Sequence, residues 1–186
     1  ATNWEALEKF ARIAEGLGVQ GPLAQLVERY IAERPLDPRA YDLQFETGLW
    51  SGRRDTSRGA VFRLAALPGL EPHAISLEAK LRALDGGPQA AISFLVATGI
   101  VMSQPASAPA LAVLAENLCS VGRCSQALRP LGQALELAPD YALLHEIRGR
   151  VLAAGGGSPE EAREAFENAV RLNPERGEGW VGLAEL

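Results

Sequence analysis

The chain has 186 residues, is 47% hydrophobic but only 6% aromatic, and carries a net charge of −5 with an isoelectric point near 5.2. A chain of this length can bury a core, and its acidic balance argues against nucleic acid or an anionic membrane as the partner, because either would need a basic face. No apolar run is long enough to span a membrane, so we expect a soluble protein of the cytoplasm or the periplasm. No basic and then apolar leader follows Ala1, and the missing initiator methionine is compatible with removal of an upstream segment.

Before residue 108 the chain favours helices joined by turns rich in glycine and proline. Alanine, leucine and glutamate are abundant, and no stretch alternates apolar and polar strand-forming residues. Proline lacks the N–H group that a helix interior needs, so Pro35, Pro38 and Pro68 mark helix ends. In chain order, we expect a helix from about Trp4 to the Gly16-Leu17-Gly18 turn, helices over Pro22–Arg34, Arg39–Trp50, Thr56–Leu67, Pro72–Leu84 and Gln89–Met102, and an irregular joint over Pro105–Pro109.

From Ala108 onward the chain repeats itself with a period of about 34 residues. The first helix of each unit carries a small residue where two helices must approach closely, at Ala115, Gly149 and Ala184. The next helix carries two alanines seven residues apart on one face, with a large residue between them, and a proline closes the unit. These sets are Ala127, Leu131, Ala134 and Pro139 in one unit, and Ala162, Phe166, Ala169 and Pro174 in the next.

The second unit is longer by one residue, which must lie between Gly149 and Ala162. The Gly155-Gly156-Gly157 turn is its expected place. Ser158 and Glu161 then have the spacing of a capping box, in which the two side chains satisfy free N–H groups at a helix start. A helix is therefore predicted to begin directly after Ser158.

The pattern resembles the tetratricopeptide repeat (TPR), a helix–turn–helix unit whose opening is matched by Trp180, Leu183 and Ala184. His145 and Arg148 depart from it. The resemblance implies an all-α fold, namely a right-handed α-solenoid of stacked antiparallel helix hairpins with about 11 helices, in a single domain over residues 1–186. The repeats implied are 1–37, 38–71 and 72–107, which are degenerate, 108–141 and 142–176, which are clear, and a half repeat over 177–186 that stops inside a helix. The amino-acid usage is typical of a high-GC bacterial gene.

No set of residues suited to catalysis, or to binding a metal or cofactor, emerges from the chain, and we predict that it is not an enzyme. His73 and His145 lie about two repeats apart, so a structural or surface role is expected for each. Cys119 and Cys124 lack the paired spacing of a zinc site. We favour one partly buried thiol on each helix. The alternative is a redox-sensitive pair, which would require a close approach across the turn.

The resemblance also implies that a protein or peptide binds along a concave groove formed by the first helix of each hairpin. The carboxylate clamp of one TPR subtype is absent, since the matching places hold Ala112, Glu116, Ile147, Glu178 and Gly182. The glutamates around Arg150 instead favour a ligand with basic or polar groups. By position, the expected groove residues are Ala112, Glu116, Asn117, Cys119, Ser120, Glu146, Arg150, Ala153, Glu178 and Glu185.

We therefore predict an interaction scaffold for complex assembly, with no cofactor and no nucleic-acid partner. The alternative is the non-catalytic TPR region of a larger protein, either a subunit of a bacterial polysaccharide- or cellulose-export system or the substrate-recruiting front of a transferase or oxygenase. Trp180, Val181, Leu183 and Leu186 form an apolar helix with no following helix to cover it. Self-association through that helix is a further expectation.

Overall fold

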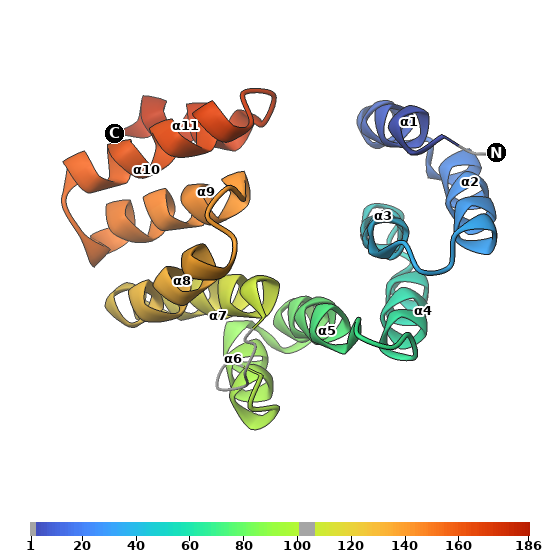
Figure 1. Ribbon diagram of the computed structural model, residues 1–186, viewed down its shortest axis with the longest axis horizontal. Helices are drawn as coiled ribbons and strands as arrows, with labels where there is room; N and C mark the ends of the chain where they lie inside the picture. The colour runs from blue at the N-terminus through green and yellow to red at the C-terminus, as the bar shows by residue number, and fades with distance from the viewer. Residues whose placement is uncertain (1–2, 101–106) are drawn as a thin grey trace. The chain divides into compact units, whose positions relative to one another are not determined.

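The computed structural model describes residues 3–100 and 107–186, and within those residues it contains helices and turns but no strand (Figure 1). The same residues form eleven α-helices, which confirms the all-α fold and the expected number of helices. The chain divides into two compact units, Ala1–Glu78 (unit 1) and Ala79–Leu186 (unit 2). A single solenoid that continues through both units stays a prediction.

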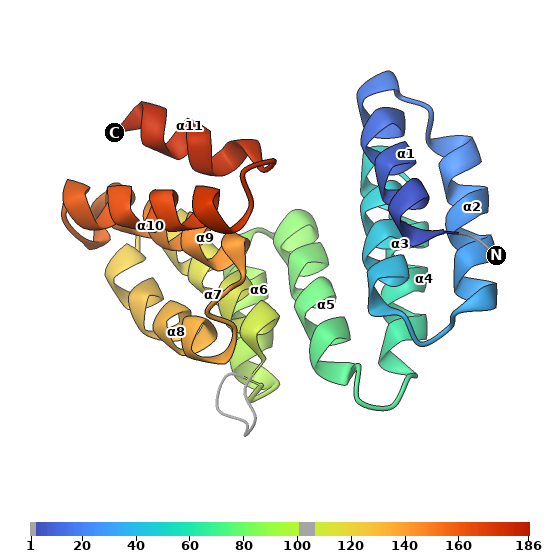
Figure 2. The same ribbon diagram turned by 45° about the horizontal axis from the view of Figure 1, so that its top comes forward.

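Unit 1 consists of helix hairpins in which α2 packs against α1 and α3, and α3 packs against α4 (Figure 2). Gly18 and Gly52 turn the chain with positive φ angles of 67° and 68°, which glycine adopts without a steric penalty. The helices are α1 (Trp4–Leu17), α2 (Gln20–Glu33), α3 (Pro38–Trp50), α4 (Arg54–Ala65) and α5 (Glu71–Gly86), which continues past residue 78. The predicted helix bounds from Pro22 to Leu84 lie within about two residues of these, the usual error of a sequence-based boundary.

The helices α3 and α4 approach closely at Gly48. A Cβ atom on Gly48 would lie only 2.8 Å from the backbone nitrogen of Ser57, so no larger residue fits there. The buried Ser57 hydroxyl donates a hydrogen bond of 2.7 Å to the carbonyl oxygen of Phe45. A buried hydroxyl needs such a partner. Small residues, Gly48 on α3 and Ser57 on α4, therefore allow these two helices to pack closely.

Asp37 joins the first hairpin of unit 1 to the second. Its carboxylate accepts hydrogen bonds from the Tyr30 hydroxyl at 2.7 Å and from two guanidinium nitrogens of Arg39 at 2.9 and 2.7 Å. It also caps the start of α3 by accepting from the backbone N–H of Arg39 at 3.2 Å. The hydrogen bonds from Arg39, and then from Tyr30, lower the pKa of Asp37 from 3.8 to about 2.

Replacing Asp37 with asparagine is expected to destabilise unit 1 by about 2 kcal/mol at neutral pH. Because the pKa is lowered on folding, the stabilisation by the carboxylate is present above pH 3.8 and is lost as the pH falls toward about 2. Urea unfolding, followed by circular dichroism at pH values across this range, should show a weaker acid dependence in Asp37→Asn than in the parent chain. Asp55→Asn, which changes a fully exposed carboxylate, is the control. Equal acid dependence in the two variants would contradict this role of Asp37.

Unit 2 contains the clear repeats, in which α9 packs against α7, α8, α10 and α11. The predicted helix over Gln89–Met102 is too long, because α6 ends at Ala97 and Gly99 turns the chain with a φ of 67°. Residues 101, 102, 105 and 106, which belong to that helix and to the expected joint, lie outside the described residues. The helices are α6 (Pro88–Ala97), α7 (Ala108–Ser120), α8 (Cys124–Leu137), α9 (Ala142–Val151), α10 (Pro159–Leu172) and α11 (Gly177–Glu185).

The extra residue of the second clear repeat is accommodated where the sequence predicts it. Residues Leu152–Gly156 form a π-helical turn, which holds one more residue than an α-helical turn. Gly155 leaves this turn with a φ of 116°, a value that favours glycine. The predicted capping box follows: Ser158 Oγ accepts from the Glu161 N–H at 3.2 Å, and Glu161 Oε2 accepts from the Ser158 N–H at 2.9 Å.

A contact with a proline carbonyl recurs at the start of α3, α9 and α11, and it extends the repeat pattern into unit 1. The side chain involved always follows the proline by six residues. The contacts are Tyr41 Oη to Pro35 O at 2.9 Å, His145 Nε2 to Pro139 O at 2.7 Å and Trp180 Nε1 to Pro174 O at 3.1 Å. Tyr41 therefore occupies the repeat position of Trp180, in a region where the predicted repeats depend on helix lengths and turn spacing.

Candidate partner-binding surface

The first helices of the last three repeats, α7, α9 and α11, form one surface of unit 2, because α9 packs against both of the others. Two hollows lie on this surface and share the side chain of Arg150. The α7–α9 hollow, of about 290 Å³, is lined by Glu116, Cys119, Ser120, Ile147, Arg150, Val151 and Ala154. The α9–α11 hollow, of about 450 Å³, is lined by Arg150, Gly177, Glu178, Val181, Gly182 and Glu185.

Charges of alternating sign occupy one repeat position along this surface. Glu116 on α7 accepts a hydrogen bond of 2.5 Å from Nη2 of Arg150 on α9, 34 residues later. Glu185 on α11 holds the next such position and lines the α9–α11 hollow together with Arg150. The Glu116–Arg150 pair is solvent-accessible on both sides, so it contributes little to stability and can exchange one partner for a charge on a ligand.

A second ion pair lies beneath the surface. Glu146 on α9 is only 2% exposed, and its two carboxylate oxygens accept hydrogen bonds of 2.8 and 2.9 Å from the guanidinium of Arg176. These bonds to Glu146, together with the nearby charges of Glu146 and Glu178, raise the pKa of Arg176 above its ordinary value. Such a bidentate pair holds both side chains in one geometry, and it fixes the turn that precedes α11.

The structure places most of the predicted groove residues at the two hollows. Those that line a hollow are Glu116, Cys119, Ser120, Arg150, Glu178 and Glu185. Ala153 is exposed but lines neither hollow, whereas Ala154 does. Ile147, Arg150, Val151 and Ala154 line the α7–α9 hollow with the spacing of one regular helix face, and Ala153 lies off that face. That these residues bind a partner stays a prediction.

Three predicted groove residues are buried, so they cannot touch a ligand in this conformation: Ala112, Asn117 and Glu146. Asn117 Nδ2 donates a hydrogen bond of 2.7 Å to the carbonyl oxygen of Val113 on its own helix, and Glu146 is covered by Arg176. The repeat position of Glu146 does not indicate that it is buried, because its burial depends on the side chain of Arg176, 30 residues later. Val151, which lines the α7–α9 hollow, was not among the predicted groove residues.

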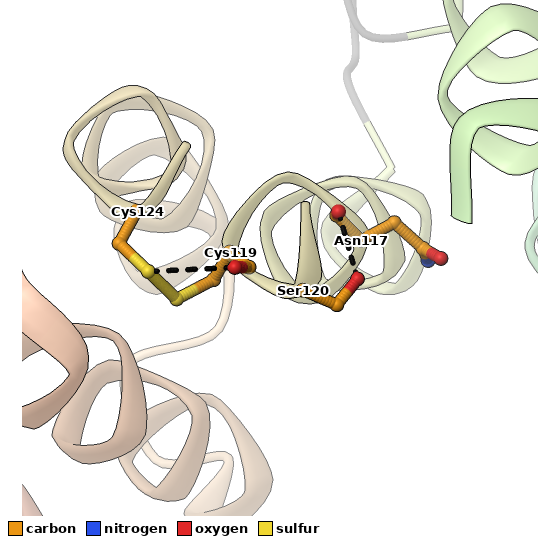
Figure 3. Close-up of a disulfide and its surroundings, with 4 residues drawn as sticks. All are labelled: Asn117, Cys119, Ser120 and Cys124. Carbon is orange, nitrogen blue, oxygen red and sulfur yellow. Dashed lines mark hydrogen bonds between the residues drawn. A yellow bond between two sulfur atoms is a disulfide. The ribbon is translucent and has the colours of Figure 1, made fainter. Parts of the chain in front are cut away.

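Cys119 and Cys124 are joined by a disulfide across the turn between α7 and α8, so the favoured interpretation of two separate thiols is wrong (Figure 3). The turn brings the cysteines together because Gly122 adopts a φ of 78°. Two backbone hydrogen bonds of 2.9 Å hold this geometry, from the Gly122 N–H to the Cys119 carbonyl and from the Arg123 N–H to the Leu118 carbonyl. The close approach required by the alternative interpretation is therefore present.

The two histidines have structural partners. His73 Nε2 lies 2.7 Å from Asp42 Oδ1 within unit 1, and His145 contacts the Pro139 carbonyl as described above. Over residues 3–100 and 107–186, no three side chains of histidine, cysteine, aspartate or glutamate gather as a metal site would require. In that same part of the chain, no helix combines the length and the hydropathy needed to cross a membrane.

Several solved structures are similar to this chain. The thermophilic TPR protein TTC0263 of Thermus thermophilus superposes with a TM-score of 0.67 at 20% identity, over 97% of each chain. The Cut9–Hcn1 hetero-tetramer of the APC/C gives a TM-score of 0.61 at 14% identity, over 96% of this chain and 35% of the other. PilW, a type IV pilus biogenesis factor, gives 0.56 at 11% identity, over 99% and 91%. No family model matches the sequence, and no curated protein does.

Proposed function

We propose that this chain, which has the fold of the TPR proteins, is a scaffold that binds an extended peptide segment with basic side chains across α7, α9 and α11. The TPR fold supports protein interaction in general. The observation that carries the finer proposal is the pair of hollows that share Arg150 of α9 and are lined by Glu116 on α7 and by Glu178 and Glu185 on α11. The proposal assigns no catalytic step to the chain.

The charges of the surface support a basic ligand. Glu116, Glu178 and Glu185 line the hollows, and Arg150 is the cation among the lining residues. Arg150 is already paired with Glu116. Glu178 is 66% exposed and has only a long contact of 3.7 Å with Arg176, so the carboxylates of the α9–α11 hollow are accessible to a ligand cation. A lysine ammonium or an arginine guanidinium would complement these carboxylates, whereas an acidic peptide would be repelled.

The geometry of stacked helices supports an extended ligand. Neighbouring packed helices lie about 8–10 Å apart, and a peptide in the extended polyproline II conformation advances about 3.1 Å per residue with three residues per turn. Side chains three residues apart on such a peptide therefore meet equivalent positions of successive repeats. Val181, which is 56% exposed, gives the α9–α11 hollow an accessible apolar wall, which suits an aliphatic residue placed between the basic ones.

A labelled model peptide tests this proposal. We expect a fluorescein-labelled peptide of about a dozen residues, with lysine at every third position among leucine and serine, to bind in a fluorescence-anisotropy titration. The same peptide with glutamate in place of lysine should not bind, and added salt should weaken the lysine peptide, because salt screens exposed charges.

Two matched variants locate the binding. The double variant Glu178→Gln, Glu185→Gln should bind the lysine peptide about fivefold more weakly, since each exposed charge pair contributes roughly 0.5 kcal/mol. The control Glu164→Gln, Glu167→Gln removes the same charge from exposed positions of α10 that line neither hollow, and it should bind as the parent does. Equal losses in the two double variants, or equal binding of the glutamate peptide, would refute the proposal.

A further inference from the structure

The Cys119–Cys124 disulfide is part of the wall of the α7–α9 hollow, and its two sulfur atoms are in unequal environments. Cys119 is half-buried and lines the hollow. Cys124 is only 7% exposed and does not line it. A molecule in the hollow therefore meets the disulfide from the Cys119 side.

The position of Cys124 also suits it to carry negative charge. It is the first residue of α8, and Arg123 before it makes no side-chain cap. The first-turn N–H groups of a helix lack intrahelical partners, and together with the helix dipole they favour an anion at that end. A thiolate formed by breaking the disulfide is accordingly better placed on Cys124 than on Cys119, which lies one residue before the end of α7.

The disulfide is not needed to shape the turn in which it lies. The two backbone hydrogen bonds from Gly122 and Arg123, described above, close the turn without it. Cys124 Sγ lies 3.6 Å from the carbonyl oxygen of Cys119, so a released thiol at Cys124 has a hydrogen-bond acceptor at hand. Cleavage of the bond therefore removes neither of the backbone hydrogen bonds that close the turn between α7 and α8.

We propose that this disulfide is a thiol–disulfide exchange site. A thiolate held in the α7–α9 hollow attacks Cys119 Sγ and forms a new sulfur–sulfur bond with it. The bond between Cys119 and Cys124 breaks, its electron pair leaves on Cys124 Sγ, and that thiolate takes a proton from water. No external oxidant is consumed, and attack by Cys124 on the mixed disulfide reverses the step and releases the ligand.

The hollow indicates the class of ligand. Arg150 presents its guanidinium in the hollow, and because its exposed pair with Glu116 can exchange one partner, it can contact an approaching thiolate in place of that carboxylate. Two sources supply this chemistry, namely a small anionic thiol such as glutathione and the cysteine of a bound peptide. The site is independent of the proposed peptide binding, because a small thiol can react in the hollow without a peptide.

The test follows where the ligand becomes attached. The native disulfide form is incubated with reduced glutathione or, in a parallel arm, with a cysteine-containing version of the lysine peptide. The products are trapped with iodoacetamide and digested with trypsin, which cuts at Arg123 and so separates the two cysteines. We expect the mixed disulfide on Cys119 at least about fivefold more often than on Cys124 in both arms. Faster exchange with the peptide would identify a peptide cysteine as the ligand, and equal or faster exchange with glutathione a small thiol.

Matched variants separate a site in the hollow from an ordinary surface disulfide. Arg150→Gln should slow the exchange about threefold, while Arg148→Gln, an exposed residue of the same helix that does not line this hollow, should leave the rate unchanged. The helical circular dichroism should survive the exchange. A mixed disulfide found equally on both cysteines or mainly on Cys124 would overturn the proposal. So would a disulfide that exchanges only after the chain is unfolded in guanidinium. Because this test works with a thiol alone, its result stands even if the lysine peptide without cysteine fails to bind.

Discussion

Replacing Phe166 with alanine is expected to destabilise unit 2 by about 3–5 kcal/mol, more than any other single truncation we propose. The ring is 2% exposed and lies between α9 and α11. A Cβ atom on Gly149 would come within 2.6 Å of the ring, and one on Gly182 within 2.3 Å. Both neighbours already lack a side chain at the contact, so neither can fill the cavity that alanine would leave. Urea unfolding followed by circular dichroism measures the loss.

Glycine-to-alanine variants test whether this contact is as close as the structure indicates. Gly149→Ala should cost about 1–3 kcal/mol, because a methyl group would overlap the Phe166 ring. Gly132→Ala on α8 is the matched control: nothing lies within 4 Å of its Cβ position, so it should stabilise the chain by up to about 1 kcal/mol through helix propensity. Combining Gly149→Ala with Phe166→Leu should cost less than the sum of the two changes. If Gly149→Ala is as harmless as Gly132→Ala, the described contact is wrong.

The repeat period was enough to predict this part of the core. Ala162, Phe166 and Ala169 are all buried, as their spacing on one helix face requires. The spacing could not identify which residues of α11 face Phe166. By the TPR pattern Trp180 was the prominent residue there, yet Trp180 is 53% exposed and Gly182 is the contact. The ring of Phe166 already occupies the space between α9 and α11, so only a residue without a side chain fits against it.

In the candidate binding surface, too, some features could be predicted from the repeat spacing, and others depend on turns and on neighbouring helices. Glu116 and Arg150 lie one repeat apart in the sequence, and in the structure they pair with each other and both line the α7–α9 hollow. The disulfide was less predictable, since it depends on the φ of 78° at Gly122, and a spacing of five residues across a turn allows other geometries. Ala154 rather than Ala153 lines the α7–α9 hollow, and that depends on how α9 is rotated against α7. Helix periodicity describes residues within one helix, whereas the turn at Gly122 and the rotation of a helix against its neighbour are set by other parts of the chain.

Replacing Arg176 with alanine is expected to destabilise unit 2 by about 3 kcal/mol. The change would leave the carboxylate of Glu146, 2% exposed, without the two hydrogen bonds that it now accepts. An unpaired buried charge generally costs about 3–5 kcal/mol. We expect the lower end of this range because the Arg176 side chain is 37% exposed, so water can reach part of the space that it vacates. The measurement is again urea unfolding, with helical circular dichroism as the signal.

A double-mutant cycle shows whether the buried charge is the cause of that loss. Adding Glu146→Gln to Arg176→Ala should recover at least about half of the lost stability, because a neutral amide is cheaper to bury than a carboxylate. Arg171→Ala, which removes an exposed arginine on α10 that donates to Asn168, should change the stability by less than about 0.5 kcal/mol. If Glu146→Gln gives no recovery, the destabilisation comes from packing of the Arg176 stem rather than from the charge. The pair would then position the turn before α11 by contact alone, and the electrostatic account of Glu146 would have to be abandoned.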